Sequence, residues 1–405
     1  MARALILIEG SSNGPLYMQA AKRLGLHPVT LSADPAKYTY LAAEGNDAVR
    51  VDTDDINALV HECSRLGTTY DIAGITGFVS RGEIVYVTVG RLCRHFGLPG
   101  PNPESVERCC DKFTQRQILE EAGVPIPLYR LAADATEVES AAAEIGLPVV
   151  LKPAVGNGST GVRLCRNLDE LTQHTTYLLG SGKRISRPPR RMLVEQFAEG
   201  PYYEAEIMGK SVVGVTAAEF EAPPHFVFRE SIFPALLSDD ERNCIADVSL
   251  SCLEALGLGW GPANIEFRWT NRGPVVIEVN PRLAEGITPR IVRLAYGVDL
   301  VAEHIKLVIG NEWDLRSRHS HTVATRILVP DRDGILDWIE GDKLAAAIPG
   351  VVEVELYVAS KDLIVRRGDW RDRMGHVIAA SPSPILAKAI LQRSVDLIDW
   401  SIIDR

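Results

Sequence analysis

The sequence predicts a multidomain protein that combines α/β and α+β architecture, and three observations lead to this fold class. The chain has 405 residues, which at about 150 residues per domain corresponds to roughly two to three domains. Over the first hundred residues, short apolar runs alternate with helical patterns, as in a parallel α/β sheet. From residue 192 to about residue 280 the pattern is mostly period two, which favours an antiparallel sheet.

The composition excludes several classes of protein. Hydrophobic residues make up 46% and charged residues 24% of the chain, as in an ordinary globular protein. The formal net charge of −10 argues against a general nucleic-acid coat, and apolar runs such as residues 147–151 are too short to span a membrane. The seven cysteines form no CxxC motif, which favours free thiols in a reducing compartment. We therefore expect a cytoplasmic protein without nucleic-acid or membrane partners.

The first unit should contain a parallel sheet flanked by helices. Its strands are expected at residues 4–8, 28–32, 48–51 and 71–75, and its helices at 15–24 and 56–66. The apolar stretch at the N-terminus is short and ends at Glu9, so it indicates a first strand rather than a signal peptide. Gly10 and Gly14 do not complete GxGxxG, which favours a plain strand-to-helix turn over a dinucleotide site.

The remaining elements divide the chain into three expected domains: an N-terminal α/β domain at 1–103, a central domain at 104–315 and a small C-terminal α/β domain at 316–405. The central domain should comprise a small lid part, about 125–198, and a large antiparallel part, about 199–315. Helices are expected at residues 104–122, 134–145, 168–179, 239–256, 290–309 and 384–394. The C-terminal segment has apolar faces that need burial, so it should pack on the rim of the central domain.

A glycine-rich loop follows a strand that ends in a lysine. Lys152 precedes Gly156-Asn157-Gly158-Ser159-Thr160-Gly161. Three glycines in six residues allow backbone N–H groups to face an anion, and the lysine adds a fixed positive charge. An ordinary hairpin turn is the alternative.

A second motif predicts a metal site. If the hairpin around Asn271-Arg272-Gly273 is symmetric about Arg272, Glu266 and Glu278 face each other, and Asn280 points to the same face. Two like charges directly opposite cost stability unless a cation lies between them. Two carboxylates and an amide oxygen suit Mg²⁺ held together with substrate phosphates. A solvated strand face is the alternative, but the surrounding strand is apolar.

Together these features resemble the ATP-grasp superfamily, because they occur in that superfamily's order. The ordered motifs are Asp111-Lys112, Leu151-Lys152-Pro153, the glycine loop, Val194-Glu195 with Phe197, Asn264 to Phe267, and Ile277 to Arg282. Within the superfamily the chain is similar to carboxylate–amine ligases of the L-amino-acid ligase type, on residues 225–235 and on C-terminal segments such as 371–378.

The resemblance implies an ATP site with Mg²⁺ or Mn²⁺. Lys112 and Lys152 would hold the phosphates, while Gly156, Gly158, Ser159, Thr160 and Gly161 close over them. Glu195 would accept a hydrogen bond from the adenine amino group, beside the backbone of Phe197 and Ala198. Tyr202 stands where a ribose-binding glutamate is common, so that role stays open between Glu204 and Glu206.

The same resemblance supplies the remaining candidates. Glu266, Glu278 and Asn280 would hold the metal, and Arg282 would act with Lys152 on an acyl phosphate. Glu83, Arg229 and Arg290 are candidates for the substrate pocket, with a structural or solvated role equally open.

The implied activity is an ATP-dependent ligase that activates a carboxylate as an acyl phosphate and joins it to an amine, giving an amide with ADP and phosphate. Its partners would be a small carboxylate and a small, amino-acid-like amine, and the sequence leaves open whether the chain forms a homodimer. Two alternatives remain: a purine-pathway ATP-grasp enzyme that acts on a ribosyl phosphate, and a non-catalytic nucleotide-binding protein.

Overall fold

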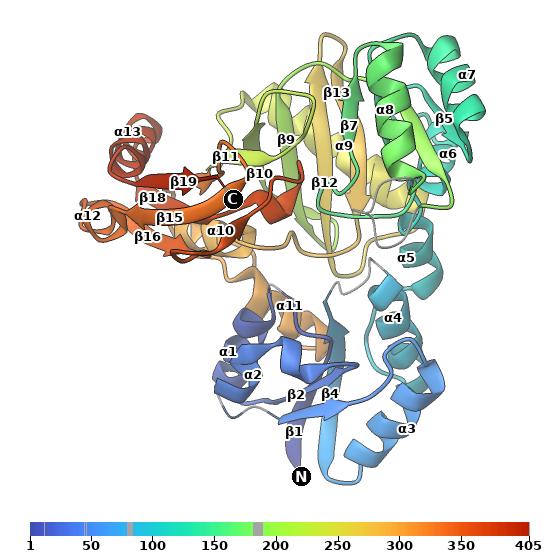
Figure 1. Cartoon of the computed structure of the whole chain (residues 1–405). Coiled ribbons are helices and arrows are strands. Elements are labelled where there is room, and N and C mark those ends of the chain that lie inside the picture. Colours follow the sequence, from blue (N-terminus) through green and yellow to red (C-terminus); the bar gives the residue numbers. More distant parts are fainter. Residues whose placement is uncertain (12, 44, 46, 79–83, 181–188, 405) are drawn as a thin grey trace.

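The computed structural model describes residues 1–11, 13–43, 45, 47–78, 84–180 and 189–404, and its N-terminal part is a parallel sheet (Figure 1). The strand order is β3-β2-β1-β4, and residues 4–8 at its centre are fully buried because helices cover both faces. The strands are β1 (Ala2–Ile8), β2 (His27–Ser32), β3 (Asp47–Arg50) and β4 (Tyr70–Gly77). The helices are α1 (Gly14–Arg23), α2 (Thr39–Ala43), α3 (Ile56–Leu66) and α4 (Ile84–Phe96), with a 3-10 turn at Pro35–Lys37.

Two predicted helices are each broken in two, and in both cases an aspartate caps the second piece. The helix expected at 104–122 is α5 (Pro103–Cys109) followed by α6 (Lys112–Glu121), and the Asp111 carboxylate accepts from the Thr114 N–H at 3.0 Å. The helix expected at 290–309 is α10 (Thr288–Tyr296) followed by α11 (Leu300–Val308). Here Gly297 ends α10 with a left-handed φ of +70°, and Asp299 caps α11.

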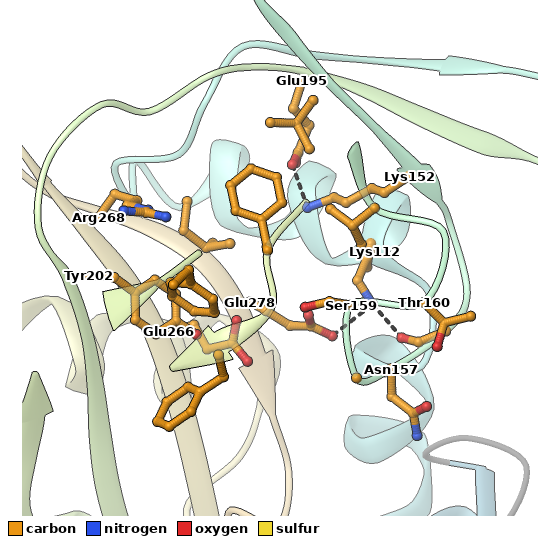
Figure 2. A pocket seen from close by; sticks show the side chains of 18 of the residues that line it. Lys112, Lys152, Asn157, Ser159, Thr160, Glu195, Tyr202, Glu266, Arg268 and Glu278 are labelled. Atoms are coloured by element: carbon orange, nitrogen blue, oxygen red, sulfur yellow. Dashed lines mark hydrogen bonds and ion pairs between the residues drawn. The ribbon is translucent and has the colours of Figure 1, made fainter. Parts of the chain in front are cut away.

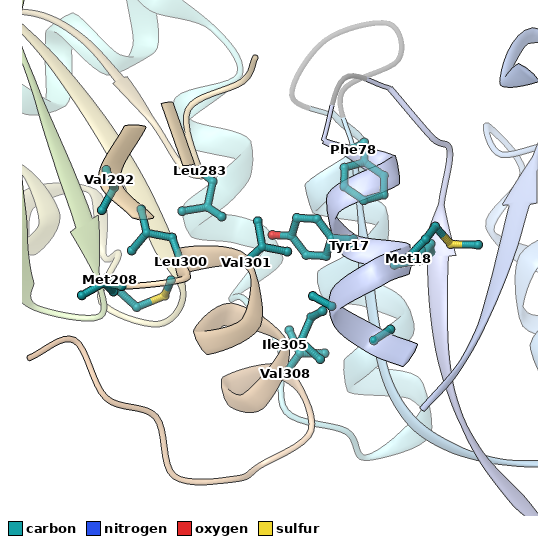
Figure 3. Close-up of a cluster of buried hydrophobic side chains, with 14 of the residues drawn as sticks. Tyr17, Met18, Phe78, Met208, Leu283, Val292, Leu300, Val301, Ile305 and Val308 are labelled. Atoms are coloured by element: carbon teal, nitrogen blue, oxygen red, sulfur yellow. The ribbon is translucent and has the colours of Figure 1, made fainter. Parts of the chain in front are cut away.

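A shared hydrophobic core joins the N-terminal sheet to the rest of the molecule (Figure 3). Helix α11 packs against α1 and β4, and Val301, Ile305 and Val308 meet Tyr17 and Met18 of α1 in one buried cluster. A Cβ at Gly74 of β4 would lie 2.6 Å from Val308, so α11 can approach the strand only because that position has no side chain. This contact fixes the N-terminal sheet relative to the central sheet.

The predicted lid part forms a small antiparallel sheet, here called the lid sheet, with strand order β5-β8-β6-β7. Its strands are β5 (Tyr129–Ala132), β6 (Val149–Pro153), β7 (Arg163–Cys165) and β8 (Met192–Gln196). Helices α7 (Ala135–Ile145) and α8 (Leu168–Leu178) contribute to its core together with residues such as Leu151 and Val194. The glycine loop, residues 156–161, connects β6 to β7.

An eight-stranded sheet forms the centre of the molecule, in the order β13-β12-β9-β10-β11-β14-β18-β16. Its first five strands along the chain are β9 (Tyr202–Met208), β10 (Ser211–Phe220), β11 (Phe228–Phe233), β12 (Pro262–Thr270) and β13 (Gly273–Asn280). Helix α9 (Asp239–Leu256) contributes to the core beneath them. The predicted combination of a parallel α/β unit and antiparallel sheets is confirmed.

The C-terminal segment, residues 316–404, adds strands to this same sheet. Antiparallel pairing joins β11 to β14, β14 to β18, and β18 to β16. These three strands are β14 (Thr322–Leu328), β16 (Val351–Leu356) and β18 (Gly375–Ser381). The other elements are β15 (Gly334–Glu340), β17 (Leu363–Ile364) and β19 (Asp399–Ile403) in a second sheet, a 3-10 turn at Trp370–Asp372, and helices α12 (Asp342–Ala346) and α13 (Pro384–Val395). No helix in the described ranges is long and apolar enough to cross a bilayer.

Candidate active site

A cavity opens between the lid sheet and the central sheet, and most of the predicted site residues line it (Figure 2). We call it the main cavity. The predicted residues that line it are Lys112, Lys152, Gly156, Gly158, Ser159, Thr160, Glu195, Phe197, Ala198, Glu204, Glu266 and Glu278. They come from α6, the lid sheet with its glycine loop, and three adjacent strands of the central sheet, so the topology gathers residues that lie far apart in the sequence.

Lys112 links the glycine loop to the central sheet. It is the first residue of α6, and its backbone N–H donates to the Ala154 carbonyl at 2.8 Å. Its Nζ donates to the Gly156 carbonyl at 2.6 Å and lies 2.8 Å from Glu278 Oε1. The side chain is only 9% exposed, and its ammonium group lies at the base of the loop, where it could contact an anionic ligand.

A buried triad of charges lies at the other end of the cavity. The Glu195 carboxylate forms ion pairs with Lys152 and, at 2.6 Å, with the Arg116 guanidinium. Burial lowers the pKa of Lys152. Burial acts to raise the pKa of Glu195, but the two cations hold it below its usual value. Glu195 thus positions Lys152, and its adenine contact stays a prediction.

Arg116 was missed by the sequence analysis, although helix α6 carries a signal for it. The buried face of α6 includes Lys112, Gln115 and Arg116, which have the i, i+3, i+4 spacing of residues on one side of a helix. Gln115 donates to the Val279 carbonyl and accepts from the Val279 N–H, both at 2.9 Å. A polar stripe on a buried face indicates a helix packed against a polar site rather than an apolar core.

The acidic residues form two rows across three adjacent strands. The register aligns Glu204, Glu266 and Glu278 in one row, and Glu206, Asn264 and Asn280 in the next. Residues two apart on a strand point to the same face, so both rows face the same side of the sheet. Asn264 Nδ2 donates to Glu206 Oε1 at 2.9 Å, and Asn280 Nδ2 lies 3.3 Å from Glu266 Oε1.

The predicted pairing of Glu266 with Glu278 is present, but the hairpin geometry that produces it differs from the prediction. It is not symmetric about Arg272, because Thr270 pairs with Gly273 across a two-residue turn. A register shift between Glu266 and Phe267 leaves Ile277 as an extra residue, and this bulge brings Glu266 opposite Glu278. Bulges are common beside active sites, where they redirect a side chain.

The carboxylates of the two rows have too few nearby positive charges to balance them. Burial and neighbouring carboxylates raise the pKa of Glu204 and of Glu266 to about 7, and burial raises that of Glu206 to about 7. Burial opposes ionisation of Glu278 as well, but Lys112 lowers its pKa. One buried oxygen of Glu206 has no hydrogen-bond partner among the described residues. Hard oxygen ligands with excess negative charge fit a divalent cation such as Mg²⁺.

These raised pKa values predict that the metal-free protein loses stability as the pH rises. Between the ordinary carboxyl pKa of 4.5 and the folded-state value of about 7, the folded state holds protons that the unfolded state releases. By linkage, the free energy of unfolding therefore falls through this range and levels off above it. Mg²⁺ binds ionised carboxylates, so the increase in unfolding temperature that it causes should grow over the same range. Thermal unfolding with EDTA or Mg²⁺ checks this, and a pH-independent Mg²⁺ effect would contradict it.

Aromatic residues form another wall of the cavity that the sequence analysis did not assign. Phe220, Phe226 and Phe228 line it, and the last two alternate with buried Val227. The Arg268 guanidinium lies 5.3 Å from the centre of the Tyr202 ring and also lines the cavity. A flat apolar wall with a stacked guanidinium suits an aromatic base.

Two further residues of the cavity come from the C-terminal segment. Trp370 and Arg373 both line it, and the backbone N–H of Trp370 donates to the Gly158 carbonyl at 3.3 Å. A Cβ at Gly158 would lie 2.5 Å from the indole, so the glycine loop can contact Trp370 only without a side chain there. No local pattern marks these residues, because their role depends on a contact across more than two hundred positions.

The other predicted residues lie at different distances from this cavity. Gly161, Glu206, Asn280 and Arg282 adjoin it without lining it, and the charge of Arg282 acts on Glu204, Glu206 and Glu278. Arg229 is exposed on β11, and Arg290 forms an ion pair with Glu353 of the C-terminal segment, so neither lines the main cavity. Glu83 lies outside the described residues.

Two family models match the chain. "Carbamoyl-phosphate synthase L chain, ATP binding domain" matches residues 111–316, which include both lysines and both carboxylate rows of the site. "L-amino acid ligase C-terminal domain 2" matches residues 326–402, most of the C-terminal segment.

Individual proteins extend this similarity. The uncharacterized protein y4rH of Sinorhizobium fredii is 57% identical over 403 residues, which cover 99% of this chain and 84% of that protein. Carnosine synthase 1 of Homo sapiens is 23% identical over 413 residues, and the match spans 95% of this chain but only 49% of that longer protein. The L-amino acid ligase structure from Bacillus licheniformis matches with a TM-score of 0.82 at 19% identity. The match covers 99% of this chain and 99% of that chain. The two chains therefore share a fold over their whole length.

Proposed function

Because this chain belongs to the ATP-grasp superfamily, and within it to the L-amino acid ligase type, we propose that it uses ATP to activate a small carboxylate and joins it to an amino-acid-like amine. The observation that carries the proposal is the main cavity itself. Lys112 and Lys152 lie on one side of it, and a row of three carboxylates lies on the other. This arrangement suits a nucleoside triphosphate held between cationic side chains and a metal site.

The proposed reaction has two steps. A carboxylate oxygen of the acid attacks the γ-phosphorus of ATP, and the bond between that phosphorus and the β-phosphate oxygen breaks, which gives an acyl phosphate and ADP. The amine nitrogen then attacks the acyl carbon, the bond to the phosphate oxygen breaks, and the nitrogen loses a proton. The products are an amide and inorganic phosphate.

The side chains of this chain would orient and neutralise the reacting groups. Lys112 and Lys152 would bind phosphate oxygens, with Lys152 held in place by Glu195. A Mg²⁺ ion held by Glu266, Glu278 and Asn280 would offset the negative charge of the transferring phosphoryl group. Arg282 lies two residues beyond the end of β13 and would face the acyl phosphate. Fixed charges aimed at a developing charge are usually the largest single contribution to catalysis.

The glycine loop would protect the acyl phosphate from water. It lines the cavity, is joined to Glu278 through Lys112, and contacts Trp370. A loop with three glycines can open and close at low steric cost, and exclusion of water prevents hydrolysis of a reactive intermediate.

The set of polar residues favours an enzyme over a non-catalytic nucleotide-binding protein. Glu266, Glu278, Asn280 and Arg282 are all present, and the first three lie on one face of two paired strands. Two opposed, partly buried carboxylates destabilise a fold that has no use for a cation.

The proposal predicts ADP and phosphate as products when ATP, Mg²⁺ and the correct acid and amine are present. A panel of amino acids, tested in pairs for phosphate release and for a new amide by mass spectrometry, measures this. Formation of AMP and pyrophosphate would reject the acyl-phosphate route, and absence of nucleotide turnover across a broad panel would favour the non-catalytic alternative.

A further inference from the structure

A second cavity lies between the lid sheet and the C-terminal segment, and positively charged side chains dominate its walls. Arg163 and His174 contribute from the lid, His225 from the connection between β10 and β11, and Arg366, Arg367 and Arg371 from the C-terminal segment. No carboxylate is among the described residues that line it. In a chain with a net charge of −10, four guanidinium groups around one cavity need an explanation. We call this space the arginine cavity.

Two of the four guanidinium groups have carboxylate partners. Arg366 lies 2.6 Å from Glu221, and Arg371 lies 2.5 Å from Asp369. For Arg163 and Arg367, no ion pair is formed with any carboxylate in the described part of the chain. Arg163 has a long contact of 3.4 Å to Gln173, and its buried Nε has no hydrogen-bond partner among the described residues. The cavity therefore contains donors that are not neutralised.

The histidines are consistent with this excess of positive charge. Burial lowers the pKa of His174 to about 4, and the charges of Arg163 and His225 act in the same direction. Burial also lowers the pKa of His225; Arg163 and Arg366 act in the same direction, and Asp372 and Glu221 in the opposite one. His174 Nε2 lies 2.8 Å from the Gly161 carbonyl, so one edge of the cavity is built on the last residue of the glycine loop.

We propose that the arginine cavity is a second anion site that binds a phosphate group, next to the main cavity, with which it shares Val162. Guanidinium groups match the spacing of phosphate oxygens and can bind them in pairs. A tetrahedral phosphate offers oxygens in several directions, which suits donors that approach from two opposite walls better than a planar carboxylate does. The proposal does not depend on the proposed ligase activity.

The site would add a link between the lid and the C-terminal segment, which already meet where Trp370 contacts Gly158. Arg163 belongs to β7 of the lid, whereas Arg367 belongs to the C-terminal segment beside Trp370, which contacts the glycine loop. Without an anion, their like charges oppose approach of the two walls, and a bound phosphate converts that repulsion into attraction. Occupancy of the site would therefore favour the closed position of the lid.

Calorimetric titration of the full chain with inorganic phosphate, and separately with glycerol phosphate, tests the site. We expect the Arg163→Gln, Arg367→Gln double variant to weaken phosphate binding at least tenfold. The control is Arg166→Gln, since Arg166 is exposed on the lid, pairs with Glu170 and does not line the cavity, and it should change the affinity less than twofold. Tighter binding of glycerol phosphate than of phosphate would identify a phosphorylated metabolite as the ligand, and the reverse order would identify inorganic phosphate.

A second measurement guards against a folding defect in the double variant. Arg367 is exposed, so Arg367→Glu alone should keep the wild-type unfolding temperature while it weakens phosphate binding. Phosphate should also slow hydrogen exchange in residues 163–178 of the wild type but not of the double variant. The proposal is overturned if the wild type binds neither phosphate compound, or if binding survives both arginine variants and is lost in Lys152→Met, since the phosphate then occupies the main cavity.

Discussion

Glu278→Ala should lower turnover on the order of 10²- to 10³-fold while the protein stays folded. Glu278 is paired with Lys112 and stands opposite Glu266, so it connects the cationic and the acidic sides of the main cavity. Its removal takes away a proposed metal ligand and leaves Lys112 without its carboxylate partner. Steady-state kinetics at saturating Mg²⁺, with unfolding temperature measured in parallel, checks both parts of the expectation.

The matched control is Glu219→Ala, which removes an exposed carboxylate from β10 of the same sheet. Turnover of this control should stay close to wild type. If Glu278→Ala turns over as fast as Glu219→Ala at saturating Mg²⁺, Glu278 does not belong to the metal site.

The substitution expected to stabilise the metal-free protein is at Glu266 and not at Glu278. The sequence alone suggests that Glu278→Ala stabilises the metal-free protein, because it relieves repulsion with Glu266. In the structure Lys112 already neutralises Glu278, whereas burial and neighbouring carboxylates raise the pKa of Glu266 to about 7. Glu266→Gln, rather than Glu278→Ala, is therefore the substitution expected to raise the unfolding temperature of the metal-free protein at pH values above about 7.

The second large effect is expected from deletion of residues 320–405, which should abolish both soluble expression and ligation. The deletion removes β14 and so exposes the hydrogen-bonding edge of β11. It also takes Val323 and Ile378 out of the core cluster that contains Leu283 and α11. An exposed edge and an opened core both favour aggregation. Comparison of soluble yield for the two lengths of chain is the measurement.

A point substitution separates the structural from the functional part of this effect. Trp370→Ala keeps the whole sheet but removes the side chain that contacts the glycine loop, so it should fold normally and bind nucleotide more weakly. A soluble truncated chain with full activity on the same substrates would show that the C-terminal segment supports neither the core nor the cavity.

The sequence predicts well which acidic side chains share one face of the sheet, because this arrangement is local, while their metal role stays a prediction. Glu266, Glu278 and Asn280 lie on one hairpin, where strand alternation and a short turn constrain which side chains meet. The bulge at Ile277 could not be predicted, because it depends on the backbone of the neighbouring elements, yet it leaves the pairing intact.

The residues that the sequence could not supply are those fixed by tertiary contacts. Arg116 pairs with Glu195 across the junction of helix α6 and strand β8, and Trp370 reaches the glycine loop from the far end of the chain. The break in the helix at Asp111 carried a readable signal, an N-cap aspartate, but helical periodicity on both sides concealed it. Residues such as these are identified from their position in the fold rather than from a local sequence pattern.

The position of Trp370 and Arg373 has a consequence for how this protein could diverge. Both lie in the connection that leads into β18, and β18 is fixed in register by β14 on one side and β16 on the other. Exposed positions of this connection, such as Trp370, can therefore accept new side chains while its ends stay anchored, and the lysines proposed to bind phosphate and the carboxylate rows belong to other elements. Descendants of one ancestral gene could acquire different substrates by changing Trp370 and Arg373, and laboratory evolution aimed at new substrates should begin with a library at these two positions.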